Sequence, residues 1–185
     1  MKKLVITYGR VASMRLTEII LNRRSIRKYK NDEIPEDKLR KILQAGLMAP
    51  SSQNRKPCEF YVIRNRGILK SLSEAKAMGA AMLSECNMAI TVLGDGEKAD
   101  TWIEDCSIAL SFMMLEAEEQ GVGSCWCQMH LRSSADGKDA EENVRGILHI
   151  SAKYRIVGVL ALGIPEQKPS PHSPDEADWN KVHYF

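Results

Sequence analysis

The sequence has few features that would place it in a specialised class of protein. Its five cysteines are an odd number without a Cys-x-x-Cys pair, which supports neither a disulfide framework nor a zinc motif. No apolar run approaches the roughly 18–20 residues of a membrane-spanning helix. A formal net charge of only +2 gives no general attraction to nucleic acid or to an anionic membrane. We therefore expect reduced thiols in a cytoplasmic protein that binds neither nucleic acid nor membrane.

The usual groups for side-chain catalysis are also missing. We find no Ser-His-Asp set, no paired carboxylates and no histidines at metal-ligand spacing. The four histidines, His130, His149, His172 and His183, are scattered. We expect each of them to be a structural or surface residue, no side chain to act as the catalyst, and no metal to be bound.

One basic segment stands out near the N-terminus. Residues 22–29 hold Arg23, Arg24, Arg27 and Lys28, with Ser25 among them, directly after an apolar run typical of a helix. Arginine presents a planar set of donors that suits phosphate, and on a continuing helix Arg23 and Arg27 would share one face. The segment indicates a pocket for a phosphorylated ligand. The alternative is a solvated helix end, where cations interact favourably with the helix dipole.

A second polar segment follows at residues 49–57. Pro50 and Pro57 bracket Ser51, Ser52 and Asn54, which are short side chains that form hydrogen bonds in loops. This composition predicts a loop with many hydrogen-bonding groups, not a helix or a strand.

Together the motifs resemble a known family. Arg-Arg-Ser-x-Arg-x-Tyr at 23–29 is followed by Ala-Pro-Ser-Ser-x-Asn at 49–54, by a helix start at 102–109, and by Gly-Val-Gly-Ser-Cys-Trp at 121–126. Ala-Leu-Gly-Ile-Pro at 161–165 and a tail ending Lys-Val-His at 181–183 also match. In this order they resemble the nitroreductase family of FMN-dependent oxidoreductases, over about residues 15–185.

The resemblance implies a fold and a reaction. The fold would be α+β and nitroreductase-like, with a central sheet flanked by helices, in an intertwined homodimer. The reaction would use FMN and either NADH or NADPH to reduce nitroaromatic, quinone or similar small acceptors by a ping-pong mechanism. The alternatives are a dehalogenase-like or flavin-fragmenting enzyme of the same fold, and a non-catalytic protein that binds a flavin or phosphate.

The resemblance also assigns cofactor-binding residues. Arg23, Arg24 and Ser25 would hold the phosphate and ribityl chain, Lys168 would add a phosphate contact, and Arg27 would place positive charge near the N1–O2 edge of the ring. A loop from the second subunit and a strand behind the ring would complete the site. The loop would contribute Pro50, Ser51, Ser52 and Asn54, and the strand Ser124, Cys125, Trp126, Cys127 and Gln128, with a backbone N–H directed at N5.

Several positions depart from the family pattern. Lys56 stands where Gln is common, Cys58 where Trp is common, and Cys127-Gln128 where Ile-Gly is frequent. The resemblance therefore does not identify the electron acceptor that this protein prefers. Cys125 and Cys127 could be redox-active, but we interpret both as buried, inert thiols.

Periodicity and turn residues predict the remaining organisation. We expect one domain over 14–185, with 1–13 as a leader or misassigned start outside the fold, and a tail after Pro165 that wraps the partner subunit. The predicted helices are about 14–24, 35–49, 68–80, 101–120 and 139–148, and the predicted strands are 59–64, 88–93, 123–127 and 156–162. Helix 101–120 is apolar nearly all round, which predicts burial in the core.

Overall fold

The computed structural model describes residues 15–185, so the predicted leader at 1–13 lies outside the described residues. The helices are α1 (Leu16–Asn22), α2 (Glu36–Leu47), α3 (Arg66–Ser73), α4 (Trp102–Glu119) and α5 (Ala140–Leu148). The strands are β1 (Cys58–Ile63), β2 (Met88–Asp95), β3 (Gly123–Gln128) and β4 (Tyr154–Gly163). Each predicted strand and helix is therefore present. α3 ends well before its predicted end, and the other helices end within about two residues of theirs.

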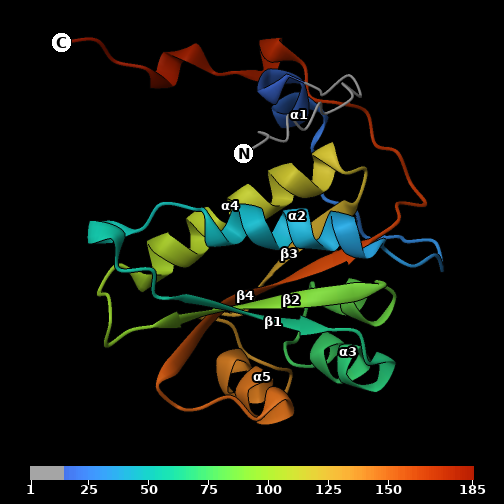
Figure 1. Ribbon diagram of the computed structural model, residues 1–185, viewed down its shortest axis with the longest axis vertical. Helices are drawn as coiled ribbons and strands as arrows, with labels where there is room; N and C mark the ends of the chain where they lie inside the picture. The colour runs from blue at the N-terminus through green and yellow to red at the C-terminus, as the bar shows by residue number, and fades with distance from the viewer. Residues whose placement is uncertain (1–14) are drawn as a thin grey trace, which may run out of the picture.

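The four strands form one sheet in the order β1-β2-β4-β3, and all neighbouring pairs are antiparallel (Figure 1). β4 lies inside the sheet, and its residues from Ile156 to Gly163 are all buried. This agrees with the near-continuous apolar run that predicted a buried strand. β1 and β3 form the two edges.

Helices cover both faces of the sheet (Figure 1). Alternate residues of β2 point to opposite faces, so Ile90 and Val92 pack with α2 and α4, whereas Ala89 and Leu93 pack with α3 and α5. Two hydrophobic cores result, one on each face. The predicted α+β architecture, a central sheet flanked by helices, is confirmed.

The long helix α4 is only partly the buried core helix that its composition predicts. Cys106, Leu110 and Met113 are fully buried against the sheet and α2. On the opposite face, however, Ile108 and Phe112 are 36% and 41% exposed. An apolar outer surface therefore remains on α4 within the single chain.

The first helix does not continue far enough for Arg23 and Arg27 to share one of its faces. α1 ends at Asn22, and the backbone of Arg23 already has ψ of 117°. The chain then runs extended, with isolated bridges from Ser25 to Ser124 and from Tyr29 to Pro165. A continued helix would forgo these long-range backbone contacts.

α3 also stops short, at Ser73 instead of about residue 80. The hydroxyls of Ser71 and Ser73 donate to the carbonyls of Gly67 and Lys70. Serine side chains that bind nearby backbone in this way compete with helix continuation. Residues 74–80 instead form turns that lead into the 3₁₀ turn Ala81–Ser84.

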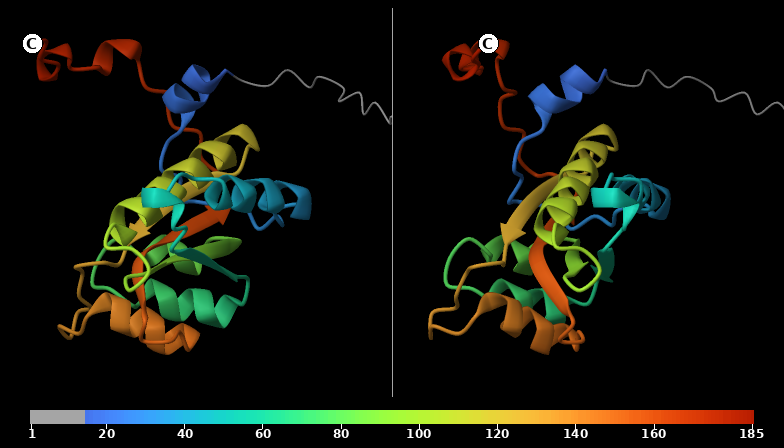
Figure 2. Two further views of the ribbon diagram at one scale, coloured as in Figure 1. Left: turned by 60° about the vertical axis from the view of Figure 1, so that its left-hand side comes forward. Right: turned by 90° about the vertical axis from the view of Figure 1, so that its left-hand side faces the viewer.

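The C-terminal segment lies beside α1, on one side of the sheet-and-helix body (Figure 2). The backbone N–H of His172 donates to the Leu21 carbonyl at 2.8 Å, and the Arg24 guanidinium donates to the Ser170 carbonyl. Of the predicted apolar stripe on α1, Ile19 is buried, but Leu16 and Ile20 are exposed. Both chain-end elements therefore present apolar side chains to solvent.

A buried carboxylate fastens α5 to the sheet. Glu141 is 3% exposed and accepts hydrogen bonds from the Arg155 guanidinium, the Ile156 backbone N–H and the His130 ring. Burial alone would raise the pKa of Glu141, but the hydrogen bonds from Arg155, Ile156 and His130 outweigh it and lower that pKa. Trp102 stacks edge-on against His130 and lies under Arg155. His130 thus takes part in packing and hydrogen bonding between α5, α4 and the sheet, which is the structural role predicted for it.

Candidate functional site

The basic segment is set against the open edge of β3. The Ile26 N–H donates to the Ser124 carbonyl at 2.9 Å, which holds Ser25 and Arg27 beside the strand. The contact is close because Gly123 has no side chain: a Cβ there would lie 2.9 Å from Ile26 Cγ2. The structure thus brings together two segments, 23–27 and 124–128, that the family resemblance assigned to one site.

The edge of β3 also presents the backbone of Trp126. The carbonyls of Ser124 and Gln128 accept bonds from groups outside the sheet, the Ile26 N–H and the Lys76 ammonium. In an antiparallel strand, alternate residues direct their backbone groups to the same side. Trp126 lies between these two residues, so its N–H and carbonyl face this edge, where a backbone N–H was predicted.

Cations surround the thiol of Cys125. Burial raises its pKa, while the charges of Arg27, Lys76 and Arg23 act in the opposite direction, as does a hydrogen bond involving Ser25. Burial likewise raises the pKa of Cys127 to about 11. Both groups are therefore protonated near neutral pH, which supports the interpretation of inert thiols. The same three cations, Arg27, Lys76 and Arg23, therefore lie near enough to β3 to act on this thiol.

Lys76 belongs to this group and was missed by the sequence reasoning. Its ammonium donates to the carbonyl of Gln128 at 2.9 Å. Gln128 belongs to β3, the strand that the basic segment also contacts. In the sequence it stood within a predicted helix, where a lone lysine has no distinguishing signal. Because α3 ends at Ser73, Lys76 lies in the turn that follows the helix, and from there its side chain reaches β3.

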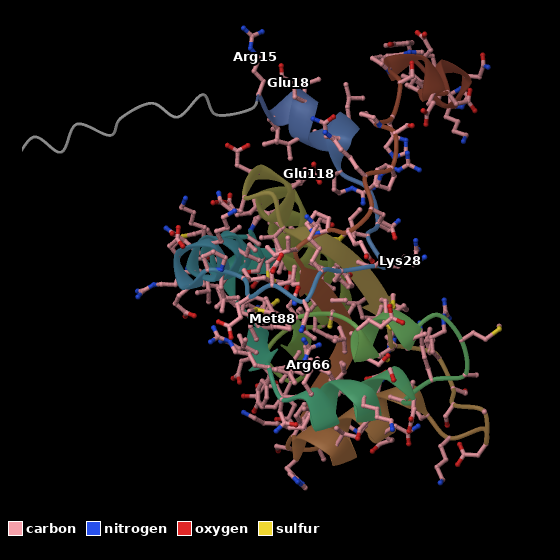
Figure 3. The ribbon with its side chains drawn as sticks, turned by 90° about the vertical axis from the view of Figure 1, so that its right-hand side faces the viewer. Arg15, Glu18, Lys28, Arg66, Met88 and Glu118 are labelled. Atoms are coloured by element: carbon pink, nitrogen blue, oxygen red, sulfur yellow. The ribbon has the colours of Figure 1, made fainter. Side chains whose placement is uncertain are left out.

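A cavity of about 570 Å³ adjoins the basic segment. Its lining includes Arg24 and Lys168, two of the predicted phosphate contacts, which come from opposite ends of the chain. Glu118 of α4 also lines it and lies just below α1 (Figure 3). Burial raises the pKa of Glu118, and the nearby charges of Arg23 and Lys168 oppose that shift. Arg24, Lys30 and Lys168 line this cavity together with the carboxylates of Glu118, Glu119 and Glu166, so its lining carries charges of both signs.

The side chains of β3 are fixed by their own contacts. The Trp126 indole N–H donates to the Gln128 side-chain oxygen at 3.0 Å, and the Gln128 amide donates to the His130 carbonyl. Gly158 on β4 leaves room for the indole, since a Cβ there would lie 2.6 Å from its nitrogen. These contacts hold the side chains of Trp126 and Gln128 in place on β3.

The loop at Pro50–Asn54 lies apart from the basic segment within one chain. The Ser52 N–H donates to Asp105 at the start of α4, whereas Arg23 acts on Glu118 near the end of that helix. At about 1.5 Å per residue, these two positions are roughly 20 Å apart along the helix axis. A single chain therefore does not bring Pro50, Ser51, Ser52 and Asn54 to the cations.

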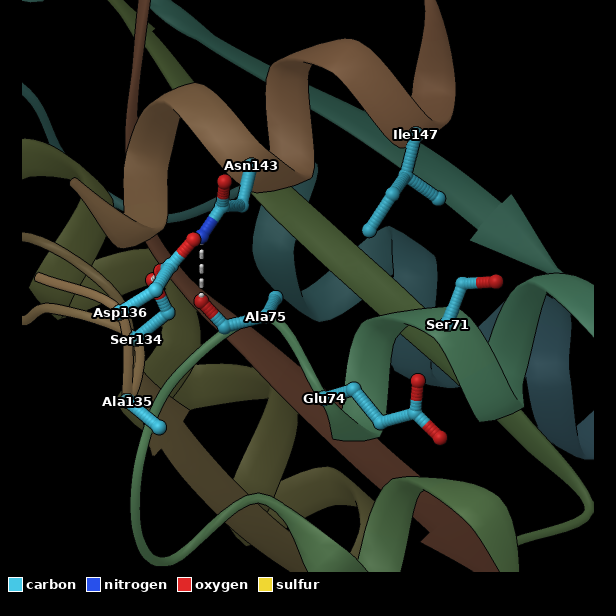
Figure 4. Close-up of a pocket in the computed structure, with 8 residues that line it drawn as sticks. All are labelled: Ser71, Glu74, Ala75, Ser134, Ala135, Asp136, Asn143 and Ile147. Carbon is cyan, nitrogen blue, oxygen red and sulfur yellow. Dashed lines mark hydrogen bonds between the residues drawn. The ribbon is translucent and has the colours of Figure 1, made fainter. Parts of the chain in front are cut away.

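The cavity between α3 and α5 is less suited to a phosphorylated cofactor. This open cavity of about 460 Å³ is lined by Glu74 and Asp136 among other residues (Figure 4). It contains no predicted site residue, and the Asn143 amide within it donates to the Ala75 carbonyl. Within residues 15–185, no three His, Cys, Asp or Glu side chains gather into a possible metal site. No helix in that range has the length and apolar character to span a membrane.

Comparison with known proteins agrees with the fold. The sequence profile described as the Nitroreductase family matches residues 20–87 and 74–164. A protein of Methanothermobacter thermautotrophicus named "Putative NADH dehydrogenase/NAD(P)H nitroreductase" is 34% identical, with 95% of this chain and 89% of the relative aligned. An NADH dehydrogenase of Thermus thermophilus is 29% identical, over 82% of this chain and 87% of that protein.

The solved structure of an FMN-dependent nitroreductase from Clostridium difficile R20291 superimposes with a TM-score of 0.88. It is 37% identical and covers 91% of this chain and 98% of its own. The protein belongs to the nitroreductase family. The predicted family, and with it the prediction of an oxidoreductase, is confirmed.

Proposed function

We propose that the protein is an FMN-dependent oxidoreductase that takes electrons from NADH or NADPH and reduces nitroaromatic, quinone or similar small acceptors by a ping-pong mechanism. The observation that carries the proposal is the seam where residues 23–27 meet the edge of β3 among converging cations. FMN, when bound, supplies the hydride and electron chemistry. The names of the relatives, an FMN-dependent nitroreductase and NADH dehydrogenases, support the cofactor and the donor.

The chain's own residues would bind and orient the cofactor. Arg23, Arg24 and Lys168 would neutralise the phosphate, with Ser25 donating to an oxygen of the same half of the molecule. Arg27, beside Cys125 on the edge of β3, would place positive charge near the ring. The N–H of Trp126 would donate to the ring from the strand edge. No side chain is required as an acid or base.

We further propose that the enzyme is a homodimer of the 14–185 domain in the cytoplasm. Two observations support a second copy: the loop at Pro50–Asn54 is far from the cations of its own chain, and apolar side chains remain uncovered. Exposed aromatic surface usually marks an interface. Such side chains occur on the tail and on α4, and include Trp179, Tyr184, Phe185 and Phe112. The tail of one subunit would wrap the other, and each loop would reach the partner's FMN.

The test compares FMN with riboflavin, which has no phosphate. In Arg23→Ala the loss of a charge-assisted contact should cost about 1.5–3 kcal/mol, or roughly 10- to 150-fold in FMN affinity. Riboflavin affinity should stay the same. Arg40→Ala, at an exposed position on α2, is the matched control and should leave both affinities unchanged. Equal FMN affinity in wild type and Arg23→Ala would contradict the phosphate assignment.

Steady-state kinetics separate the enzyme from a protein that only binds flavin. A ping-pong mechanism gives parallel double-reciprocal lines when NADH and a quinone are varied together. His172→Ala should leave reduction of bound FMN by the nicotinamide intact, because that ring forms a surface pair with Glu176. Loss of reduction with FMN still bound would show that a side chain performs essential chemistry.

A further inference from the structure

Two cysteines beside the loop that we assign to the partner's flavin site are in direct contact. The sulfur of Cys58, the first residue of β1, lies 3.5 Å from that of Cys106 in α4. Cys106 is fully buried, whereas Cys58 is partly exposed and lines a cavity of about 70 Å³ with Pro50 and Ser51. One thiol of the pair is therefore accessible to a small reagent, and the other is not.

The sheet makes room for this contact at Gly94. Cys58 is paired with Gly94 across β1 and β2, and a Cβ on that glycine would lie 3.0 Å from the Cys106 sulfur. It would lie even closer to the Trp102 ring. The Cys106 thiol thus occupies space over the cross-strand partner of Cys58, so the strand register and the glycine together fix the sulfur–sulfur contact.

The surroundings give the two sulfurs different reactivity. The hydrogen bond from Cys106 lowers the pKa of Cys58, and the charge of Lys98 acts in the same direction, against burial and Asp105. The contact with Cys58 and burial both raise the pKa of Cys106. The opposite shifts make Cys58 the more acidic of the two thiols, and this is the order required of an attacking and a resolving cysteine.

We propose that Cys58 and Cys106 form a redox-active pair that hydrogen peroxide closes into a reversible disulfide. The Cys58 thiolate attacks one peroxide oxygen, the O–O bond breaks, and the departing hydroxide takes a proton to become water. The resulting sulfenic acid is attacked by the Cys106 sulfur. The S–O bond then breaks and a second water leaves with the Cys106 proton. Two thiols and one peroxide give one disulfide and two waters, and two electrons pass from sulfur to oxygen.

The position of the pair connects its oxidation to the neighbouring loop. Asp105, next to Cys106, holds the Ser52 N–H, and three residues of the loop have positive φ: Gln53, Asn54 and Lys56. Non-glycine residues tolerate such angles only where surrounding contacts enforce them. Bond formation must bring the two sulfurs from 3.5 Å to about 2 Å apart at the start of β1 and of α4, beside this loop. If the loop serves the partner's flavin as proposed above, oxidation lowers the reductase activity.

The experiment counts thiols in the full-length protein, with FMN bound and after its removal. Peroxide should lower the intact mass by about 2 Da, the loss of two hydrogen atoms. Iodoacetamide under denaturing conditions should then label three of the five cysteines, and dithiothreitol should restore all five. Cys106→Ser should stop at a sulfenic acid on Cys58, about 16 Da heavier and trapped by dimedone. Cys58→Ser should form neither product.

Cys86→Ala is the control, because that buried thiol donates to a backbone carbonyl and is not part of the pair. It should still lose two thiols to peroxide. A wild-type protein that keeps all of its reactive thiols would overturn the proposal, as would a disulfide that persists in Cys58→Ser. Because the experiment measures thiols and mass, its result tests the proposed disulfide whether or not the protein binds FMN.

Discussion

The substitution Gly123→Ala tests how the basic segment is held against β3. The added Cβ would lie 2.9 Å, 3.0 Å and 3.1 Å from Cγ2, Cβ and Cγ1 of Ile26. Since one of these atoms is the Ile26 Cβ, a change of side-chain rotamer cannot relieve the clash and the backbone must shift. Overpacking of this kind typically costs about 1–3 kcal/mol. For a chain of this size, that corresponds to a fall in Tm of roughly 2–12 °C.

Gly146→Ala is the matched control. Gly146 lies inside α5, and a Cβ there would meet no atom within 4 Å. Because alanine loses less backbone freedom than glycine on entering a helix, this substitution should stabilise the protein by roughly 0.5–1 kcal/mol. The two glycine-to-alanine changes should therefore shift the thermal unfolding midpoint in opposite directions at one protein concentration.

A double-mutant cycle locates the effect. Ile26→Ala removes two of the three clashing atoms, so the Gly123→Ala/Ile26→Ala variant should be destabilised by at least about 0.5 kcal/mol less than the sum of the single changes. Fluorescence titration should also show weaker FMN binding in Gly123→Ala, since displaced Ile26 carries Ser25 and Arg27 with it. If Gly123→Ala melts and binds FMN like wild type, the packing of Ile26 does not position the segment.

Three further outcomes test other parts of the structure. Glu141→Gln should lower the free energy of unfolding by about 1.5–3 kcal/mol at neutral pH. Because the folded pKa of Glu141 is lowered, its contribution to the free energy of unfolding is present above the ordinary carboxyl pKa and is lost as pH falls through the lower folded value. When the pH is lowered, the Tm of Glu141→Gln should therefore fall less steeply than that of wild type. Asp105→Ala removes the acceptor for the Ser52 N–H and should speed tryptic cleavage after exposed Arg55; an unchanged rate would mean that this bond does not hold the loop. Deletion after Pro165 should abolish both dimer and FMN binding, and a truncated monomer with stoichiometric FMN on a sizing column would contradict the role given to the tail.

The sheet and its main helices could be predicted because their signals are local. The apolar run of β4 and the stripe on α2, with Leu39 and Ile42 inward, reflect burial at each position. The grouping of 23–27 with 124–128 came from a family resemblance, and the structure brings them together through the bond from Ile26 to Ser124. Roles toward the cofactor remain predictions.

Features that depend on distant partners could not be read from the sequence. The end of α1 is decided by bridges to Ser124 and Pro165, which lie far along the chain. Lys76 reaches the Gln128 carbonyl only because α3 stops early. The contact between Cys58 and Cys106 depends on strand register and on Gly94. In each case the deciding contact joins residues that no short window of sequence contains.

The strand order has a consequence for how the chain folds. β1 and β2 are neighbours in sequence and in the sheet, but β4 must pair between β2 and β3, so the sheet is complete only when residues up to 163 are available. Pairings between such distant segments form slowly, because closing the intervening chain costs entropy before any contact repays it. During synthesis, residues 23–27 therefore leave the ribosome long before β3, and β3 in turn waits for β4. The edge that would receive the cofactor is thus among the last parts of the molecule to form.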